Sequence, residues 1–585
     1  MNYPVWYLPE TGGGLLIALI AITHVFVAHF AVGGGLYLVL TERKGLRENN
    51  PDILAFTKRH TRFFMLVTMV YGGITGVGIW FIISLVQPAA TSLLIHTFVY
   101  GWAAEWVWFL VEITALLVYY YTFDRMDSRT HQAVGWIYFV AAWLSLFLIN
   151  GIIDFMLTPG AWVVDHNFWS GFFNPSFWPS LFFRTFLSFM LAGLYAFVTC
   201  AFLKDPGFKA KMTRYSGTWA LGSLTLMLPC AYWYFAILPE PARALVTGSS
   251  PTIRAAGEFA LYAMVATMIL LLLLTVIRPA YNSKAVAILA LVPAFLLLGA
   301  FEWTREAARR PFVLNQVMYS NGVTLAEAEE LQGESFLART KWAAVHEVSD
   351  ENLTRAGAEL FKFQCYACHT IGGLNNDILP KTAAMDFPTL HGYLLNVIHK
   401  RPYMQPFLGT EEEAAALAAY IVGELHGKDV DPALLEAPTG QGQKLYEENC
   451  VGCHGLDIIE EWAQGLTLSE IIAGLESLSS LNDMMENFSG TTGEKELLAG
   501  FFQSPRAQPL SDVETGRAIF EQNCTGCHGS DVIVDWSQGR SVKAIAEALV
   551  ALGKLNPMMA GLSLDDAERQ AVAAWALSGR EGEEQ

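Results

Sequence analysis

The stretch "ENCVGCHG", residues 448–455, decides the fold of the C-terminal half of the chain. A near copy, "QNCTGCHG", occupies residues 522–529, and a looser one, "FQCYACHT", occupies residues 363–370. Each copy contains Cys-x-x-Cys-His, the sequence to which c-type haem is attached: the two thiols bond to the haem and the adjacent His ligates the iron. The copies predict three covalent haems, attached through Cys365, Cys368, Cys450, Cys453, Cys524 and Cys527 and ligated by His369, His454 and His528.

The last two copies belong to a tandem repeat. Sliding the chain by 74 residues places Cys450 on Cys524 and aligns four further positions without a gap. In each unit a Gly precedes an aromatic residue and the first Cys, and a Met and a second aromatic follow later. The aligned pairs are Gly442 with Gly516, Tyr446 with Phe520, Met485 with Met559, and Phe501 with Trp575; the first unit supplies Gly357, Phe361, Met404 and Tyr420.

This pattern resembles the class I cytochrome c fold. The resemblance implies that the first and last helices of each unit cross where only Gly allows the close approach. It also implies that Met404, Met485 and Met559 are the second axial ligands, which raises the haem potential. Met484 and Met558 are adjacent alternatives, although "MENF" and "MAGL" align better with "MQPF" at 404–407. Three small helical domains are expected, at 351–430, 435–507 and 509–581.

The N-terminal half has a different character. Hydrophobic residues make up 53% of the chain, and they concentrate in residues 1–305. A membrane-spanning helix needs about 20 mostly apolar residues. Eight segments qualify, so we expect a mainly α-helical protein with an eight-helix transmembrane bundle, a connector at 306–350 and the three cytochrome c domains. The expected spans are 14–41, 63–88, 93–122, 132–157, 179–203, 215–238, 257–277 and 283–303.

Basic residues predict the orientation of the bundle. Lys and Arg concentrate in alternate loops, at 43–62, 123–131, 204–214 and 278–284, whereas the other loops carry only Arg243 and Arg254. Basic loops stay in the cytoplasm. The N-terminus and the haem-binding half are therefore expected on the periplasmic side of a bacterial inner membrane. The net charge of −18 argues against a nucleic-acid partner and suits basic protein partners.

Ionisable residues inside spans are candidates for function because burying them is costly. "THVFVAHFAVGGGLYLVLTER", at 23–43, and "WFLVEI", at 108–113, resemble the first and third helices of cytochrome bd oxidase subunit I. "REAARRPF" and "YAMVA", at 305–312 and 262–266, resemble its later haem-site segments. The resemblance implies a membrane haem ligated by His24 and Glu306 with Arg309 close by, a haem-site or proton-path carboxylate in Glu112, and a further ligand in Met264. Glu105 lies seven residues before Glu112, on the same helix face, and is expected to carry protons with it.

The departures from that family also carry information. By alignment Arg184, in "FFRTF", occupies the place of a family His that pairs with the Met around a second haem. An arginine is a poor iron ligand, and inside a span it needs a partner, for which a haem propionate and Asp154 are candidates. The connection at 239–256 is too short for the family's quinol-binding loop. The second haem and the quinol site are therefore expected to be lost.

Two functions are compatible with these features. In the first, electrons enter from a periplasmic carrier through three c haems and reach one or more non-covalent haems, of b or d type, where oxygen is reduced. In the second, the chain is an electron conduit within a larger respiratory complex that links the quinone pool or partner subunits to periplasmic cytochromes. Expected partners are other respiratory subunits or a second bd-like subunit. His29 and His96 are open as ligands of an extra haem.

Overall fold

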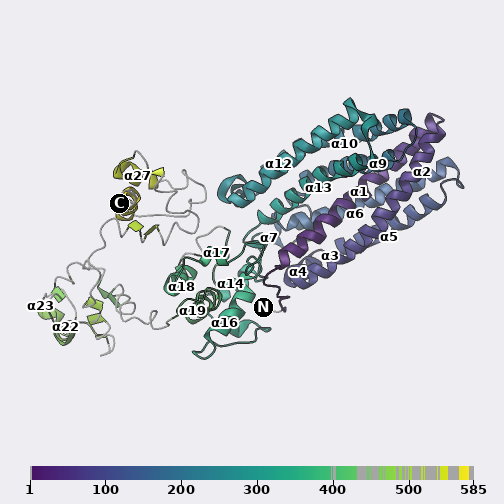
Figure 1. Ribbon diagram of the computed structural model, residues 1–585. Coiled ribbons are helices and arrows are strands. Elements are labelled where there is room, and N and C mark those ends of the chain that lie inside the picture. The colour runs from purple at the N-terminus through teal and green to yellow at the C-terminus, as the bar shows by residue number, and fades with distance from the viewer. Residues whose placement is uncertain are drawn as a thin grey trace.

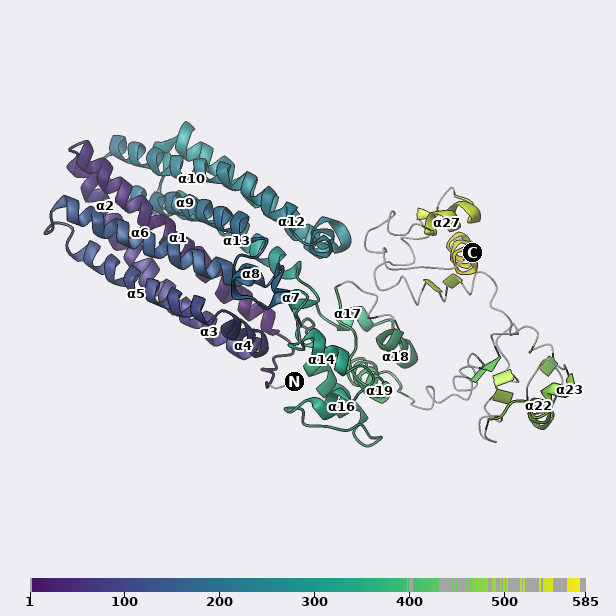
Figure 2. The same ribbon diagram turned by 180° about the vertical axis from the view of Figure 1, so that it is seen from behind.

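The computed structural model describes residues 3–396, 398 and 403–430, together with shorter segments toward the C-terminus. The described part of the chain is mainly helical, as predicted (Figure 1). Both views place the first cytochrome c-type unit at the end of the helical bundle that carries the N-terminus (Figures 1 and 2). The shorter segments are 445–446, 449–450, 459, 462–463, 466, 468–481, 487–490, 495, 498–499, 501–502, 516–517, 519–520, 536–537, 540–550 and 566–578.

All eight expected spans are helical. Seven of these helices are long and apolar enough to cross a membrane, and the exception is α10, which is long enough but less apolar and lies alongside α9. The chain is thus a multi-pass membrane protein. The long helices are α1 (Gly13–Arg47), the continuous α2 (Pro51–Met65), η1 (Leu66–Gly72) and α3 (Gly73–Val86), α5 (Val99–Tyr121), α6 (Ser128–Phe155), α9 (Phe177–Ala201), α10 (Pro206–Ala236), α12 (Pro251–Leu272) with η3 (Leu273–Ile277), and α13 (Lys284–Ala307).

Two helix boundaries differ from the sequence prediction. The basic loop expected at 43–62 is almost entirely helical, because Asn50 caps α2 by accepting from the backbone N–H groups of Asp52 and Ile53, and Pro51 opens the helix. The third span begins at Val99 rather than residue 93, since the chain breaks at Phe98 and the preceding residues form a separate helix, α4 (Pro88–Thr97).

The bundle packs around α1 and α9. A Cβ added at Gly33 of α1 would lie 1.9 Å from the backbone oxygen of Ser188 in α9, so the two backbones approach as closely as only Gly allows. Buried side chains of α1, α6, α9, α10 and α13 form the main hydrophobic core around this contact. The contact fixes the depth of α9 relative to α1, and thereby the depth of the polar residues on both helices.

The connector and the first cytochrome c-type unit share one core. Phe336 and Leu337 of the connector are buried in it, and their backbone N–H groups donate to the carboxylate of Glu413 at 2.9 and 2.8 Å. The elements here are β1 (Phe312–Leu314), β2 (Met318–Tyr319), α14 (Leu325–Glu330), α15 (Phe336–Arg339), α16 (Leu353–Leu360), η5 (Phe361–Cys365), α17 (Leu379–Thr382), α18 (Phe387–Asn396), α19 (Glu411–Ala419) and η7 (Tyr420–Leu425).

The remaining described elements are short. Four lie between the long helices at the outer end of the bundle, and one connects α12 to α13. Four belong to the two C-terminal units, which have small hydrophobic cores of their own. These elements are α7 (Trp162–Asp165), α8 (Phe168–Phe172), α11 (Glu240–Ala244), η2 (Leu245–Ser249) and η4 (Pro279–Tyr281), and then α22 (Leu468–Leu475), α23 (Leu478–Leu481), α27 (Val542–Leu549) and α29 (Asp566–Ser578).

Candidate haem sites and the electron route

The first haem-attachment motif lies at the end of η5 and in the turn that follows it. Cys365 and Cys368 form no disulfide, so both sulfur atoms are available for thioether bonds. The His369 ring donates from Nδ1 to the backbone oxygen of Asn376, 3.0 Å away, which leaves Nε2 to face an iron. Burial lowers the pKa of His369 to about 4, so the imidazole is in the neutral form that ligates metal.

Met404 completes the candidate ligand set. Its half-buried side chain packs against the same core as Cys365. The hydroxyl of Tyr393 donates to Met404 Sδ over 3.6 Å and so restrains the thioether. A neutral imidazole and a restrained thioether are the two donors that a His/Met-ligated c haem needs, so His369 and Met404 are the candidate axial ligands of the first haem.

The predicted crossing of the first and last helices is confirmed in two units. A Cβ added at Gly357 would lie 2.0 Å from Ala416 O and 2.6 Å from Tyr420 Cβ. In the last unit a Cβ at Gly516 would lie 1.9 Å from Ala571 O. The two aromatic residues of each unit also meet, with ring centroids 6.0 Å apart for Phe361–Tyr420, 5.9 Å for Tyr446–Phe501 and 4.4 Å for Phe520–Trp575.

Most predicted ligands of the second and third haems lie outside the described residues. Cys450 is described, and its backbone N–H donates to Tyr446 O at 2.8 Å within the second unit. The assignments that stay predictions from sequence are Cys453, His454, Met485 and its alternative Met484, and Cys524, Cys527, His528, Met559 and its alternative Met558.

Gly516→Val is expected to abolish the third haem site and leave the other two. The valine side chain cannot fit 1.9 Å from Ala571 O, so the first and last helices of that unit cannot cross. Intact mass and haem staining after denaturing electrophoresis should show two covalent haems instead of three. Gly222→Val is the control, because a Cβ at Gly222 meets nothing within 4 Å. Three haems in Gly516→Val would refute the assigned crossing.

The N-terminal segment, residues 3–12, holds the first haem motif against the bundle. The hydroxyl of Tyr366, a residue between the two attachment cysteines, accepts from Leu8 N at 3.0 Å and donates to Trp6 O at 3.1 Å. Ile371 N donates to Pro9 O at 2.8 Å. A Cβ at Gly373 would lie only 1.9 Å from Glu10 O. The segment leads directly into α1, so the first haem motif lies at the outer end of that helix.

His24 lies on α1, about 15 Å further along the helix than Gly14 at a rise of 1.5 Å per residue. Its ring Nδ1 is 3.1 Å from Thr75 Oγ1 in α3. The Thr75 hydroxyl proton is already donated to Tyr71 O at 2.8 Å, so His24 Nδ1 must be the donor to Thr75. Nε2 is then deprotonated, which is the form a haem iron requires.

Glu306 does not share a site with His24. Ile22 and Phe26 form the face of α1 that meets α13, since Ile22 lies 3.6 Å from the Cβ position of Gly299 and the Phe26 and Phe295 rings are 5.3 Å apart. His24 is two residues from each of them, about 200° around the helix, and turns away from α13. The helix faces thus do not bring His24 and Glu306 together, and a single iron held by both has no support from this packing.

At the outer end of α13 Glu306 has a protein partner. Its carboxylate pairs with the guanidinium of Arg309, which is buried and also donates to Val313 O. Arg309 thus lies close to Glu306, as the family resemblance implied. Met264 of α12 is partly buried and packs against the main hydrophobic core. Its role in haem binding stays a prediction from the resemblance.

Glu105 and Glu112 lie on α5 at two depths. The hydroxyl of Tyr138 is 3.1 Å from Glu112 Oε1 and 3.0 Å from Ala31 O of α1. Tyr138 has one proton for these two acceptors, so both hydrogen bonds form only when Glu112 is protonated. Glu112 thus lies at the depth of Ala31. Glu105 lies seven residues nearer the outer end of α5 than Glu112 does. His24 lies seven residues nearer the outer end of α1 than Ala31 does, so Glu105 and His24 lie at the same depth.

Arg184 has a partner that the sequence did not indicate. The side chain is 2% exposed, and its Nη1 lies 3.1 Å from Glu302 Oε1 of α13, whereas its buried Nη2 has no hydrogen-bond partner among the described residues. Arg305 binds the other oxygen of Glu302 at 2.9 Å. His29 lies within electrostatic range of Arg184 and Glu302, and its buried Nε2 has no partner among the described residues. An ion cluster therefore occupies the position where the family has a haem-ligating His.

Two parts of the chain match known protein families. Residues 15–233, within the membrane half, match the family model of cytochrome bd terminal oxidase subunit I and are thus similar to that subunit. Residues 352–421 and 511–575 match the model of cytochrome c oxidase, cbb3-type, subunit III. The bd-like bundle followed by cytochrome c units makes the chain a haem protein of respiratory electron transport.

The structure of bd oxidase from Geobacillus thermodenitrificans matches over 52% of this chain and 87% of its own, with 17% sequence identity and a TM-score of 0.47. No curated protein matches this chain as a relative.

Arg184→Met in the bd-like domain is expected to destabilise the bundle by about 3–5 kcal/mol, because it leaves the buried Glu302 with an incomplete set of partners. The triple variant Arg184→Met/Glu302→Met/Arg305→Met should recover much of that loss, since no buried charge of the cluster then remains without its partner. Thermal unfolding in detergent measures both. Equal destabilisation in the single and triple variants would show that the three residues do not act as a unit.

Proposed function

We propose that this chain accepts electrons from a carrier in the periplasm through its c haems and delivers them to a membrane haem beside His24, where oxygen is reduced. The haems, when bound, supply the one-electron and oxygen chemistry. One observation carries the proposal: the N-terminal segment fastens the first haem motif to α1, the helix that also presents the deprotonated Nε2 of His24.

The chain's own residues have separable roles in this proposal. Cys365 and Cys368 attach the first haem, and His369 and Met404 ligate its iron. Thr75 holds the tautomer of His24. Glu105 and Glu112 carry protons, since Glu112 shares a hydrogen bond with Tyr138 and Glu105 lies at the depth of His24. The distribution of Lys and Arg supports a periplasmic location for the c-type units in a bacterial inner membrane.

A second membrane subunit fits one face of the bundle. Trp106, Phe109 and Leu110 of α5 are exposed, and the half-buried Glu105 lies beside them. A carboxylate facing lipid is costly, and a neighbouring bd-like subunit would cover it. This partner belongs to the proposal for the active complex.

Carbon monoxide distinguishes the proposal from the electron-conduit alternative. An oxygen-reducing haem keeps one coordination position open, so the dithionite-reduced protein is expected to show a carbon monoxide difference spectrum from its non-covalent haem. The His/Met-ligated c haems have both axial positions filled and should not respond. A non-covalent haem whose spectrum is unchanged by carbon monoxide would favour the conduit.

A further inference from the structure

A cavity of about 470 Å³ lies where the bundle meets the first cytochrome c-type unit. Its walls come from the junction of α3 and α4, the N-terminal segment, the β2–α14 turn and the haem motif itself, which contributes Tyr366 and Ala367. Apolar side chains such as Val86, Leu93 and Trp162 alternate with a few polar ones. This volume and lining are typical of a small-molecule site.

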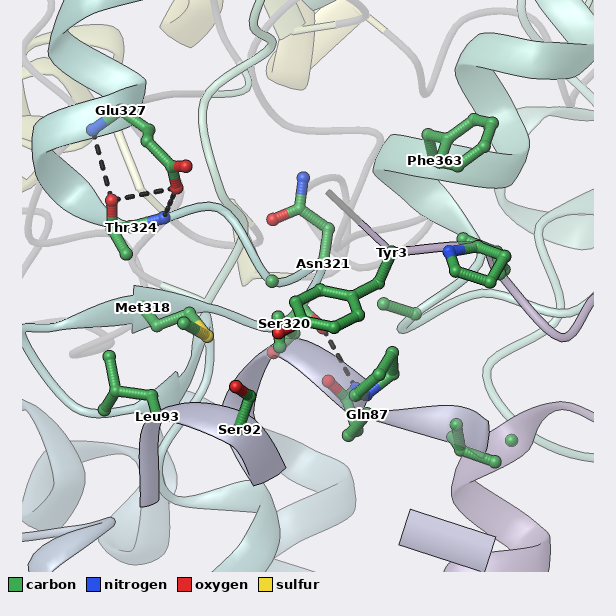
Figure 3. A pocket seen from close by; sticks show the side chains of 18 of the residues that line it. Tyr3, Gln87, Ser92, Leu93, Met318, Ser320, Asn321, Thr324, Glu327 and Phe363 are labelled. Carbon is green, nitrogen blue, oxygen red and sulfur yellow. Dashed lines mark hydrogen bonds between the residues drawn. The ribbon is translucent and has the colours of Figure 1, made fainter. Parts of the chain in front are cut away.

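Asn321 offers an unpaired donor to the cavity. It is 8% exposed, and its Oδ1 accepts from Val323 N at 3.2 Å. Its Nδ2 has no hydrogen-bond partner among the described residues. Figure 3 shows the Asn321 side chain in the middle of the cavity, between Tyr3 and Thr324. A buried amide without an acceptor costs free energy, so the site calls for a ligand that supplies one.

Among the described residues that line the cavity, Asn321 Nδ2 is the one buried side-chain donor without a partner, and two neighbouring polar side chains are paired. Gln87 Nε2 donates to Ser320 O at 3.0 Å (Figure 3). The Glu327 carboxylate accepts from both the backbone N–H and the hydroxyl of Thr324, each at 2.9 Å. The unpaired donor is therefore specific to Asn321, and the matching ligand atom is a hydrogen-bond acceptor such as a carbonyl oxygen.

A groove leads from the cavity along the side of the bundle. It shares Tyr3, Val5 and His96 with the cavity and continues past Leu85 and Ile95, on helices whose sides face lipid. His96 donates from Nδ1 to Ser92 O at 2.7 Å, so its Nε2 can accept from a ligand hydroxyl. The groove is mostly apolar, and so it suits a hydrocarbon tail.

We infer that the cavity binds an amphiphile from the membrane, whose head group presents a carbonyl oxygen to Asn321 Nδ2 and whose tail follows the groove. Two sources share this chemistry: the ring carbonyl of a prenylated quinone and the ester carbonyl of a phospholipid. The site is separate from the shortened loop at 239–256, and its occupancy does not depend on oxygen reduction.

The test uses the full-length haem-loaded protein in nanodiscs and two photoactivatable probes, an azidobenzoquinone with a ten-carbon tail and an azido-acyl phosphatidylglycerol. At least one probe should label peptides from 84–97 or 316–327, and the probe that does so identifies the source. In Asn321→Asp the side-chain carboxylate still accepts from Val323 N, but no N–H remains to donate to a ligand. This variant is therefore expected to reduce the labelling about tenfold.

Asn167→Asp is the matched control. It makes the same change at the outer end of the bundle, at a residue whose Oδ1 also accepts from a backbone N–H, that of Trp169, and which does not line the cavity. Its labelling should equal that of the unmodified protein. If Asn321→Asp loses covalent haem, Ala89→Phe, which fills the cavity from α4, replaces it. No labelling by either probe, or equal labelling in the cavity variant and the control, would overturn the inference.

Discussion

His24→Ala is expected to remove one non-covalent haem and to abolish oxygen reduction, while all three c haems remain reducible from the periplasmic side. The reason is the state of the ring: Thr75 accepts the Nδ1 proton, so Nε2 is free to bind iron. Pyridine haemochrome analysis of purified protein measures covalent and extractable haem separately. A full haem complement in His24→Ala would show that the bd-like domain uses another ligand.

His131→Ala is the control for this variant. His131 is also a buried histidine of the bundle, but both of its ring nitrogens have protein partners, Nδ1 with Glu42 Oε1 at 2.7 Å and Nε2 with Tyr119 O at 2.8 Å. It should keep every haem. Thr75→Val is expected to give an intermediate result, because loss of a hydrogen bond behind a metal ligand lowers affinity about 10–100-fold. Haem loss in Thr75→Val under dilution, with retention in His131→Ala, would identify Thr75 as a positioning residue.

Gly373→Val is expected to stop electron passage from the c haems to the membrane haem without removing any haem. A side chain at this position collides with Glu10 O, 1.9 Å from its Cβ, and forces the N-terminal segment away from the haem motif. The loss of contact would separate Tyr366 from Trp6 and Leu8, which now share hydrogen bonds. Stopped-flow spectroscopy should show fast reduction of the c haems and a membrane haem that stays ferric.

Gly392→Val serves as the control for the docking variant, since a Cβ at Gly392 in α18 meets nothing within 4 Å. It changes the same unit by the same substitution but lies away from the N-terminal segment. Normal electron passage in Gly373→Val would mean that the contact with the segment does not set the route.

The sequence predicted those parts of the protein that depend on local spacing. The Cys-x-x-Cys-His motifs, the 74-residue repeat and the Gly beneath an aromatic residue are all short-range patterns, and the positions of Gly357 and Gly516 confirm the crossing. The helix cap at Asn50 could also have been predicted, because Asn followed by Pro is typical of a helix start. The basic residues around it were instead interpreted as a loop.

The arrangement around α1 could not be read in the same way. This helix is apolar on every side, so its pattern does not say which face meets which neighbour. The pairing of His24 with Glu306 followed from the order of segments in the family and not from helix faces. The contacts of Ile22 and Phe26 with α13 place His24 on the opposite face of α1. His29 lies three residues from Phe26 and four from Gly33, so it is on the face of α1 that meets α9 and α13. This spacing is the only feature of the sequence that indicates a position for His29 beside Arg184.

The docking of the first haem unit on the N-terminal segment could not be predicted from the sequence either. The N-terminal segment has no motif and no regular secondary structure, and its partners Tyr366, Ile371 and Gly373 lie about 360 residues away in the chain. Such long-range backbone contacts leave no periodic trace in a sequence. They nevertheless determine which haem faces the membrane domain.

The most direct test of the proposed electron route is the order in which the haems become reduced. The oxidised, detergent-purified protein is mixed anaerobically with a reduced, water-soluble cytochrome, and the c-type and non-covalent haem bands are followed in one stopped-flow record. The account predicts that the c haems are reduced first, that the membrane haem follows from them, and that adding oxygen reoxidises the membrane haem before the c haems. A membrane haem that is reduced before the c haems, or that stays oxidised while they are fully reduced, would contradict it.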